Sequence, residues 1–119
     1  MRALLSGLEN NSFNPLDLIE DVVVSNDWPH NRADNDTLYV EVGGEWCDYQ
    51  LTLAWSNDHK LLQYTWTYNI KVPLKKYNSL YSLLNKINLN ISCGHFELWI
   101  DEGYLMYRNS LISFDYSSI

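Results

Sequence analysis

The sequence predicts an α+β domain in which one antiparallel sheet carries helices on one face, with the elements in the order α-β-β-β-α-β-β. Two segments repeat apolar residues every three or four positions, as amphipathic helices do, and five segments alternate apolar and polar residues, as half-buried strands do. A chain of 119 residues has the size of one domain. We expect this domain at residues 14–112, between an N-terminal leader at 1–13 and a short tail at 113–119.

The first helix is predicted from Pro15 to about Asn26. Asn14 has the side chain of a helix cap, Pro15 suits the first helical position, and Asp17 lies at the positive end of the helix dipole. Trp28-Pro29 ends the helix, and the polar segment 31–36 is predicted to be a loop. The apolar residues that share one face of this helix are Leu16, Ile19, Val22 and Val23.

A period of two residues then predicts a meander of three strands, from residue 37 to residue 70. Gly43-Gly44 is predicted as a two-residue turn that sets Val42 opposite Glu45, and the following loop sets Trp55 opposite Lys60. The second face of these strands is polar. The residues predicted on the core face are Leu38, Val40, Val42, Cys47, Tyr49, Leu51, Leu53, Trp55, Leu62, Tyr64, Trp66, Tyr68 and Ile70.

The second helix is expected between Val72-Pro73 and Cys93-Gly94, because apolar residues again recur at helical spacing in this segment. Its stripe consists of Tyr77, Leu80, Tyr81, Leu84, Ile87 and Ile91.

A hairpin is predicted at the end of the domain, with a second strand that runs to about Ile112. A two-residue loop at Glu102-Gly103 sets Glu97 opposite Arg108 and Trp99 opposite Met106. A three-residue loop would change both pairs. We favour the two-residue loop.

Composition excludes several classes of function. The chain has 8 Lys and Arg against 15 Asp and Glu, a net charge of -7, which disfavours binding to nucleic acid or to anionic membranes. No apolar run approaches the roughly 20 residues of a membrane-spanning helix. The chain has two cysteines, too few for a disulfide framework, and the leader lacks the features of a signal peptide, so we expect a cytoplasmic protein.

The sequence contains no phosphate-binding loop, metalloprotease motif or nucleophile elbow. The potential metal ligands lack the spacing of a tetrahedral site, and nothing in the sequence orients His95, Asp101 and Ser110 as a hydrolytic set. We therefore predict no catalytic residue, no cofactor and no metal. Those potential ligands are His30, Cys47, Cys93 and His95.

Aromatic residues make up 14% of the chain, too many for all of them to point into so small a core. The predicted registers place Trp46, Trp99, Tyr104 and Met106 on the outer face of the sheet, away from the helices. An apolar patch there indicates a surface for a protein partner. The alternative is a strand face that the termini of the chain cover, or exposed aromatics that are merely scattered. Trp28 is instead expected to pack against the first helix.

Five motifs follow one another along the chain: Asn14-Pro15-Leu16-Asp17, Asn26-Asp27-Trp28-Pro29, Gly44-Glu45-Trp46-Cys47-Asp48-Tyr49, Gly94-His95-Phe96-Glu97-Leu98-Trp99 and Met106-Tyr107-Arg108. Together they resemble the YbjN family, in particular its alphaproteobacterial branch, over residues 14–112.

This resemblance implies a fold similar to that of type III secretion chaperones: a helix, three strands, a helix, two strands and usually a final helix. The tail at 113–119 stands where related chains have that final helix. The resemblance implies no known enzymatic activity. Family members are labelled sensory transduction regulators, and chaperones of similar fold are small, acidic, cytoplasmic homodimers that hold a client segment along the sheet.

We therefore expect a non-catalytic protein-binding module, a regulator or chaperone that acts as a homodimer on a protein partner or client. The alternative function is a small-ligand sensor with an aromatic pocket between the helices and the sheet.

Overall fold

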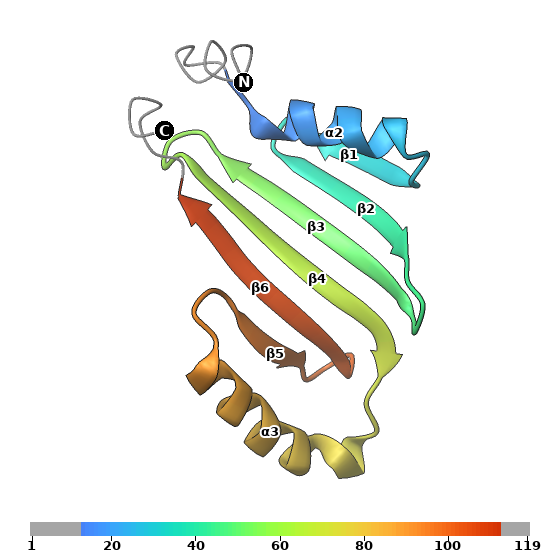
Figure 1. The fold of residues 1–119 in the computed structure, drawn as a ribbon, viewed down its shortest axis with the longest axis vertical. Coiled ribbons are helices and arrows are strands. Elements are labelled where there is room, and N and C mark those ends of the chain that lie inside the picture. The colour runs from blue at the N-terminus through green and yellow to red at the C-terminus, as the bar shows by residue number, and fades with distance from the viewer. Residues whose placement is uncertain (1–12, 113–119) are drawn as a thin grey trace.

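The computed structural model describes residues 13–112, which fold into two α-helices, a short 3₁₀ helix and one six-stranded antiparallel sheet (Figure 1). The strand order is β1-β2-β3-β4-β6-β5. The α+β class and the predicted order of elements are confirmed, while the tail and all of the leader except Phe13 lie outside the described residues. The elements are α2 (Pro15–Ser25), β1 (His30–Asp34), β2 (Thr37–Gly43), β3 (Asp48–Ser56), β4 (Leu61–Lys71), η1 (Leu74–Lys76), α3 (Tyr77–Asn90), β5 (His95–Trp99) and β6 (Tyr104–Ile112).

Helix α2 begins and ends where the sequence predicts. The side chain of Asn14 accepts a hydrogen bond from the backbone N–H of Leu16 at 2.9 Å, Pro15 is the first helical residue, and Asn26 follows the last turn. Leu16 and Val23 are buried against the sheet. Val22, which we predicted on the same face, is 55% exposed, because it lies on the flank of the helix rather than beneath it.

Strand β1 occupies most of the segment that we predicted to be a polar loop. It pairs antiparallel with β2, so that Arg32 lies opposite Leu38 on the side of the sheet that faces α2. The guanidinium group of Arg32 bonds to carboxylates of α2, at 3.0 Å from Asp17 and 2.9 Å from Glu20. A charged edge strand of this kind shows no apolar alternation, and its polar groups discourage pairing with other chains.

All three predicted hairpin registers differ from the observed ones by an even number of residues. Val42 pairs with Tyr49 instead of Glu45, and Trp55 pairs with Leu62 instead of Lys60. In the last hairpin Trp99 pairs with Tyr104 instead of Met106, so the prediction of a two-residue loop there is wrong. Each observed loop holds four residues: 44–47, 57–60 and 100–103. An even shift keeps each strand residue on its predicted face.

Two residues predicted on the core face of these strands lie elsewhere. Cys47 is half-buried in the β2–β3 loop, because β3 begins only at Asp48. Ile70 is 53% exposed, because the β4–β6 register shifts between Thr67 and Lys71.

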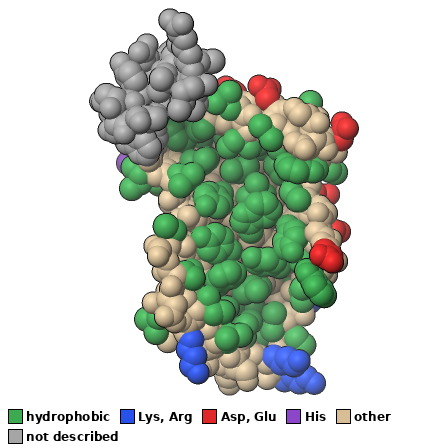
Figure 2. Space-filling view, in the orientation of Figure 1, with side chains coloured by type: hydrophobic (Ala, Val, Ile, Leu, Met, Phe, Trp, Pro, Cys, Tyr) green, Lys and Arg blue, Asp and Glu red, His purple; other side chains and the backbone are tan. Residues whose placement is uncertain are grey.

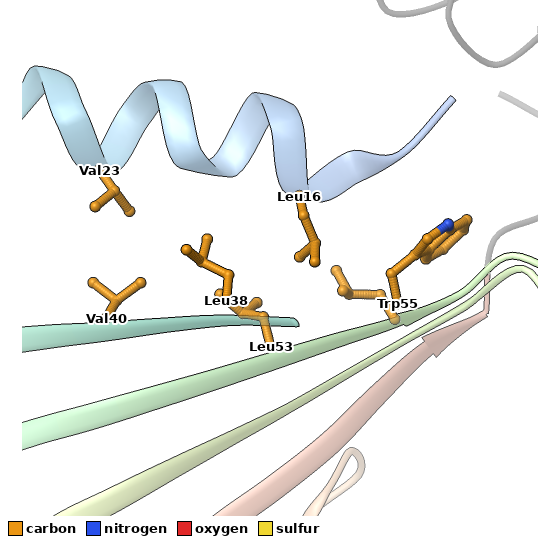
Figure 3. Close-up of a cluster of buried hydrophobic side chains, with 7 residues drawn as sticks. Leu16, Val23, Leu38, Val40, Leu53 and Trp55 are labelled. Atoms are coloured by element: carbon orange, nitrogen blue, oxygen red, sulfur yellow. The ribbon is translucent and has the colours of Figure 1, made fainter. Parts of the chain in front are cut away.

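The closely packed core lies beneath α2, between this helix and strands β2 to β4 (Figure 3). Leu16 and Leu38 have no exposed surface, and Val40 is 1% exposed. Burying one such side chain contributes roughly 1.5–3 kcal/mol. The core cluster consists of Leu16, Val23, Leu38, Val40, Leu53, Trp55 and Leu62.

Helix α3 lies at the opposite end of the sheet, beside the edge strand β5 (Figure 1). It ends at Asn90, close to the predicted end, and Leu84 is its buried residue. The side chain of Asn88 accepts a hydrogen bond from the N–H of Phe96 at 2.8 Å and donates one to the C=O of Phe96 at 3.0 Å. This amide therefore takes the place of a neighbouring strand at the edge of β5.

Candidate protein-binding faces

The sheet offers two surfaces of different character. The outer face carries the strand side chains that point away from α2. The inter-helix face lies on the side of α2, between α2 and α3, and we define it by seven residues. They are Tyr49, Leu51, Tyr64, Trp66, Tyr68, Phe96 and Tyr107.

Rings of the inter-helix face form a connected series across four strands. Tyr49 contacts Trp66 edge-on at a centroid distance of 6.2 Å and Tyr68 at 5.3 Å. The series continues from Tyr68 to Phe96 at 6.5 Å and from Phe96 to Tyr107 at 5.1 Å. Burial raises the pKa of Tyr68, and the neighbouring Tyr49 adds to the effect.

We predicted Tyr49, Tyr64, Trp66 and Tyr68 on the core face, but each of them remains partly accessible. Helix α2 packs against β2 and β3, and α3 lies beside β5, so neither helix covers these rings fully. Figure 2 shows hydrophobic side chains across the middle of this surface, with charged side chains at its margins. The inter-helix face is thus a large apolar surface without a cover in the described part of the chain.

The outer face is mainly polar and contains a hollow of about 520 Å³ near the β2–β3 turn and the β5–β6 turn. Trp99 and Tyr104, a directly opposed pair on β5 and β6, line one side of it. Strands β2, β3 and β4 contribute Glu41, Gln50 and Thr67. Aromatic rings in a polar surrounding are typical of the centre of a protein-binding surface.

Three of the four residues predicted for partner binding lie together. Trp99 is 47% exposed beside Tyr104, and Met106 follows Tyr104 by two residues on the same face of β6. Trp46 does not lie on a strand face as predicted, because the longer loop places it in the β2–β3 connection, where it is 85% exposed. The register error at this hairpin accounts for the difference.

A second hollow of about 540 Å³ on the outer face contains a charged cluster. Glu97 accepts a hydrogen bond from Arg108 at 3.3 Å, although Arg108 is opposite His95 and not opposite Glu97 as we predicted. The His95 ring lies 2.8 Å from the same carboxylate oxygen. Burial raises the pKa of Glu97, but the hydrogen bonds from His95 and Arg108 outweigh it, so the net shift is below the ordinary value.

Within residues 13–112, no three His, Cys, Asp or Glu side chains come together as a metal site would require. His95, which sequence reasoning considered for metal binding and for hydrolysis, instead bonds to Glu97. The described helices include none that is long and apolar enough to cross a membrane.

A protein-family model for YbjN, described as "Putative bacterial sensory transduction regulator", matches residues 15–117. The chain belongs to the YbjN family. The match covers α2 through β6, so both faces of this YbjN protein lie within the family domain. Searches of curated proteins and of solved structures gave no match. The family description names a regulator and no enzymatic reaction.

Proposed function

We propose that this YbjN protein is a non-catalytic regulator that acts in the cytoplasm by binding a protein partner or client on its outer face, as secretion chaperones do. Trp99 is the central contact, flanked by Tyr104 and Met106. The family description supports the regulatory role. Both cysteines are free thiols, which suits a reducing compartment.

The observation that carries the proposal is the half-exposed Trp99 at the side of a hollow whose lining combines polar and apolar groups. Transient interfaces have about the polarity of ordinary protein surface, with Trp, Tyr, Met and Arg concentrated at their centres. Permanent interfaces are more apolar. The outer face fits the first description, and the inter-helix face fits the second.

The chemistry of the hollow indicates what the partner presents. Glu41 and Asp48 line it as acids, and Gln50, Thr67 and Asn69 offer hydrogen-bonding groups. A partner segment with an apolar side chain would pack on Trp99, and a basic residue nearby in that segment would pair with the acidic residues of the hollow.

The hollow also bears on the alternative function, a small-ligand sensor. Its size falls in the range of small-molecule sites, roughly 300–1,000 Å³. It opens on the outer face, however, whereas that alternative required a pocket between the helices and the sheet. An open position of this kind favours a protein segment over an enclosed ligand.

Co-purification from the native cells, followed by mass spectrometry, tests the proposal. We expect the tagged wild-type protein to recover one partner in near-stoichiometric amount. Trp99→Ser is expected to lose that partner, because truncating a central contact costs about 2 kcal/mol or more of binding energy. Recovery of the same partner by wild type and by Trp99→Ser in equal amount would contradict the proposal.

Tyr39→Ser is the matched control. Tyr39 is also an aromatic residue on the outer face, 37% exposed, but it lies on β2 outside the lining of the hollow. It is expected to retain the partner. Trp46→Ser in the same experiment determines whether the β2–β3 loop extends the binding surface.

A further inference from the structure

Exposed apolar side chains continue from the inter-helix face onto α2. Asp17 and Glu20 of this helix point toward β1, where they bond to Arg32. Helical spacing places Leu18 and Val22 on the other flank, toward the middle of the sheet. They are 45% and 55% exposed, so this flank adds to the uncovered apolar surface.

Helix α3 also has an apolar flank with no contact to its own sheet. Leu84 is the residue buried against the sheet, whereas Leu83 and Leu89 are 53% and 76% exposed. Lys86 lies between them at three-residue spacing, on the side of the helix turned away from Leu84. The outward flank of α3 thus presents two leucines around a lysine.

The charges of the domain are separated between its two ends. Residues 15–41, which include α2, contain seven Asp and Glu residues and only one Lys or Arg, Arg32, whose charge Asp17 and Glu20 already neutralise. Residues 71–90, which include α3, contain four Lys residues and no Asp or Glu. Figure 2 shows Lys and Arg side chains at the α3 end of the molecule and Asp and Glu side chains toward the α2 end.

We propose that a second copy of this chain covers the inter-helix face, with α3 of each copy lying against α2 of the other. In this arrangement the outward flank of α3, with Leu83, Lys86 and Leu89, meets the flank of α2 that carries Leu18 and Val22. Lys86 then comes near Asp21, which neighbours Leu18 at three-residue spacing on the outward side of α2. Both exposed apolar flanks and both apolar faces are then buried in one symmetric contact.

Charge decides between the two symmetric ways of placing face against face. In the first arrangement the two-fold axis lies in the plane of the contact, perpendicular to the direction from α2 to α3. It brings the acidic end of each copy to the basic end of the other. An axis along that direction would bring α2 against α2 and α3 against α3, with like charges together, which costs binding energy. Only the first arrangement satisfies the apolar flanks and the charges at once.

Analytical ultracentrifugation of the full chain tests the proposal. We expect wild type at micromolar concentration to have twice the 14.0 kDa mass of the chain. Val22→Gln and Leu83→Gln are expected to weaken the dimer about tenfold or more, as truncation of central interface residues does. Val24→Gln is the matched control, since Val24 is 56% exposed but lies on the opposite flank of α2, and it is expected to change the dissociation constant less than about twofold.

Charge reversal tests the pairing of α2 with α3. Asp21→Lys and Lys86→Glu are each expected to weaken the dimer, more at low salt than at high salt. Combined in one chain they are expected to restore it, because the helices then meet with their charges exchanged. Asp58→Lys, the same change of charge in the β3–β4 loop, is expected to have no effect.

Two results would overturn this arrangement. A mass of 14.0 kDa at every concentration would mean that another segment of the chain or another protein covers the face. A dimer that Val22→Gln leaves intact, or that the two charge reversals together weaken further, would place the contact elsewhere. Trp99→Ser is expected to leave the dimer unchanged, so failure of this arrangement is distinguishable from failure of partner binding on the outer face.

Discussion

Replacement of Asn88 by alanine tests how α3 is fixed to the sheet. The Asn88 side chain makes two hydrogen bonds to the backbone of Phe96, at 2.8 Å and 3.0 Å, and both are partly buried. A hydrogen bond contributes about 1 kcal/mol net, and more where the partner group stays buried and unpaired. We therefore expect Asn88→Ala to lower the free energy of unfolding by about 2 kcal/mol, equivalent to roughly 8 °C in Tm for a domain of this size.

Urea denaturation followed by tryptophan fluorescence measures this loss. Wild type and variants are compared at one protein concentration, because the proposed dimerisation would make stability depend on concentration. Asn85→Ala is the control, since it removes the same amide from an exposed position of α3 and alanine favours the helix. Equal stability of Asn88→Ala and Asn85→Ala would refute the role assigned to these two hydrogen bonds.

Two further predictions concern the core and the charged cluster. Leu38→Ala is expected to destabilise the protein by about 3–4 kcal/mol in urea denaturation, because Leu38 is fully buried beneath α2; Leu111→Ala, at a 53% exposed position, is expected to cost less than about 1 kcal/mol. Similar losses for both would contradict the position of the core. The folded state lowers the pKa of Glu97, so the ionised carboxylate stabilises the fold at any pH above the ordinary pKa of a glutamate. This contribution disappears as the pH falls through the lowered pKa of the folded state. Glu97→Gln should therefore be less stable than wild type at neutral pH, and the difference should vanish in acid; a constant difference would count against the cluster.

The sequence predicts both α-helices, five of the six strands in the described residues and the face of most of their side chains, but not the pairing of residues across the hairpins. Hairpin registers that differ by two or four residues put the same side chains on the same face, so the apolar alternation does not distinguish them. The pair Gly43-Gly44 favoured a tight turn, yet the observed loop runs from Gly44 to Cys47. That difference moves Trp46 off the strand and accounts for the error at this candidate binding residue.

Strand β1 could not be found from apolar alternation because its inward side chain is charged. Arg32 occupies a position on the helix side of the sheet, where two carboxylates of α2 satisfy it. A sequence pattern records the residue type at such a position, but not the partner that permits it. The same limit applies to Asn88, since nothing in the sequence of α3 shows that its amide bonds to β5.

The inter-helix face shows a third limit. The alternation of Tyr64, Trp66 and Tyr68 correctly predicts one side of the sheet. It does not tell whether a helix of the same chain covers that side. Here α2 covers the residues around Leu38 and leaves the aromatic series partly accessible. Apolar patterning therefore predicts the direction of a side chain better than its burial.

The affinity of the recovered partner for purified wild type and for Trp99→Ser tests the proposed function most directly. Isothermal titration calorimetry, with Tyr39→Ser as control, measures it in solution. The proposal predicts that Trp99→Ser weakens binding by about 2 kcal/mol or more, roughly thirtyfold in Kd, while Tyr39→Ser binds as wild type does. Equal affinities of wild type and Trp99→Ser would contradict binding at the outer face.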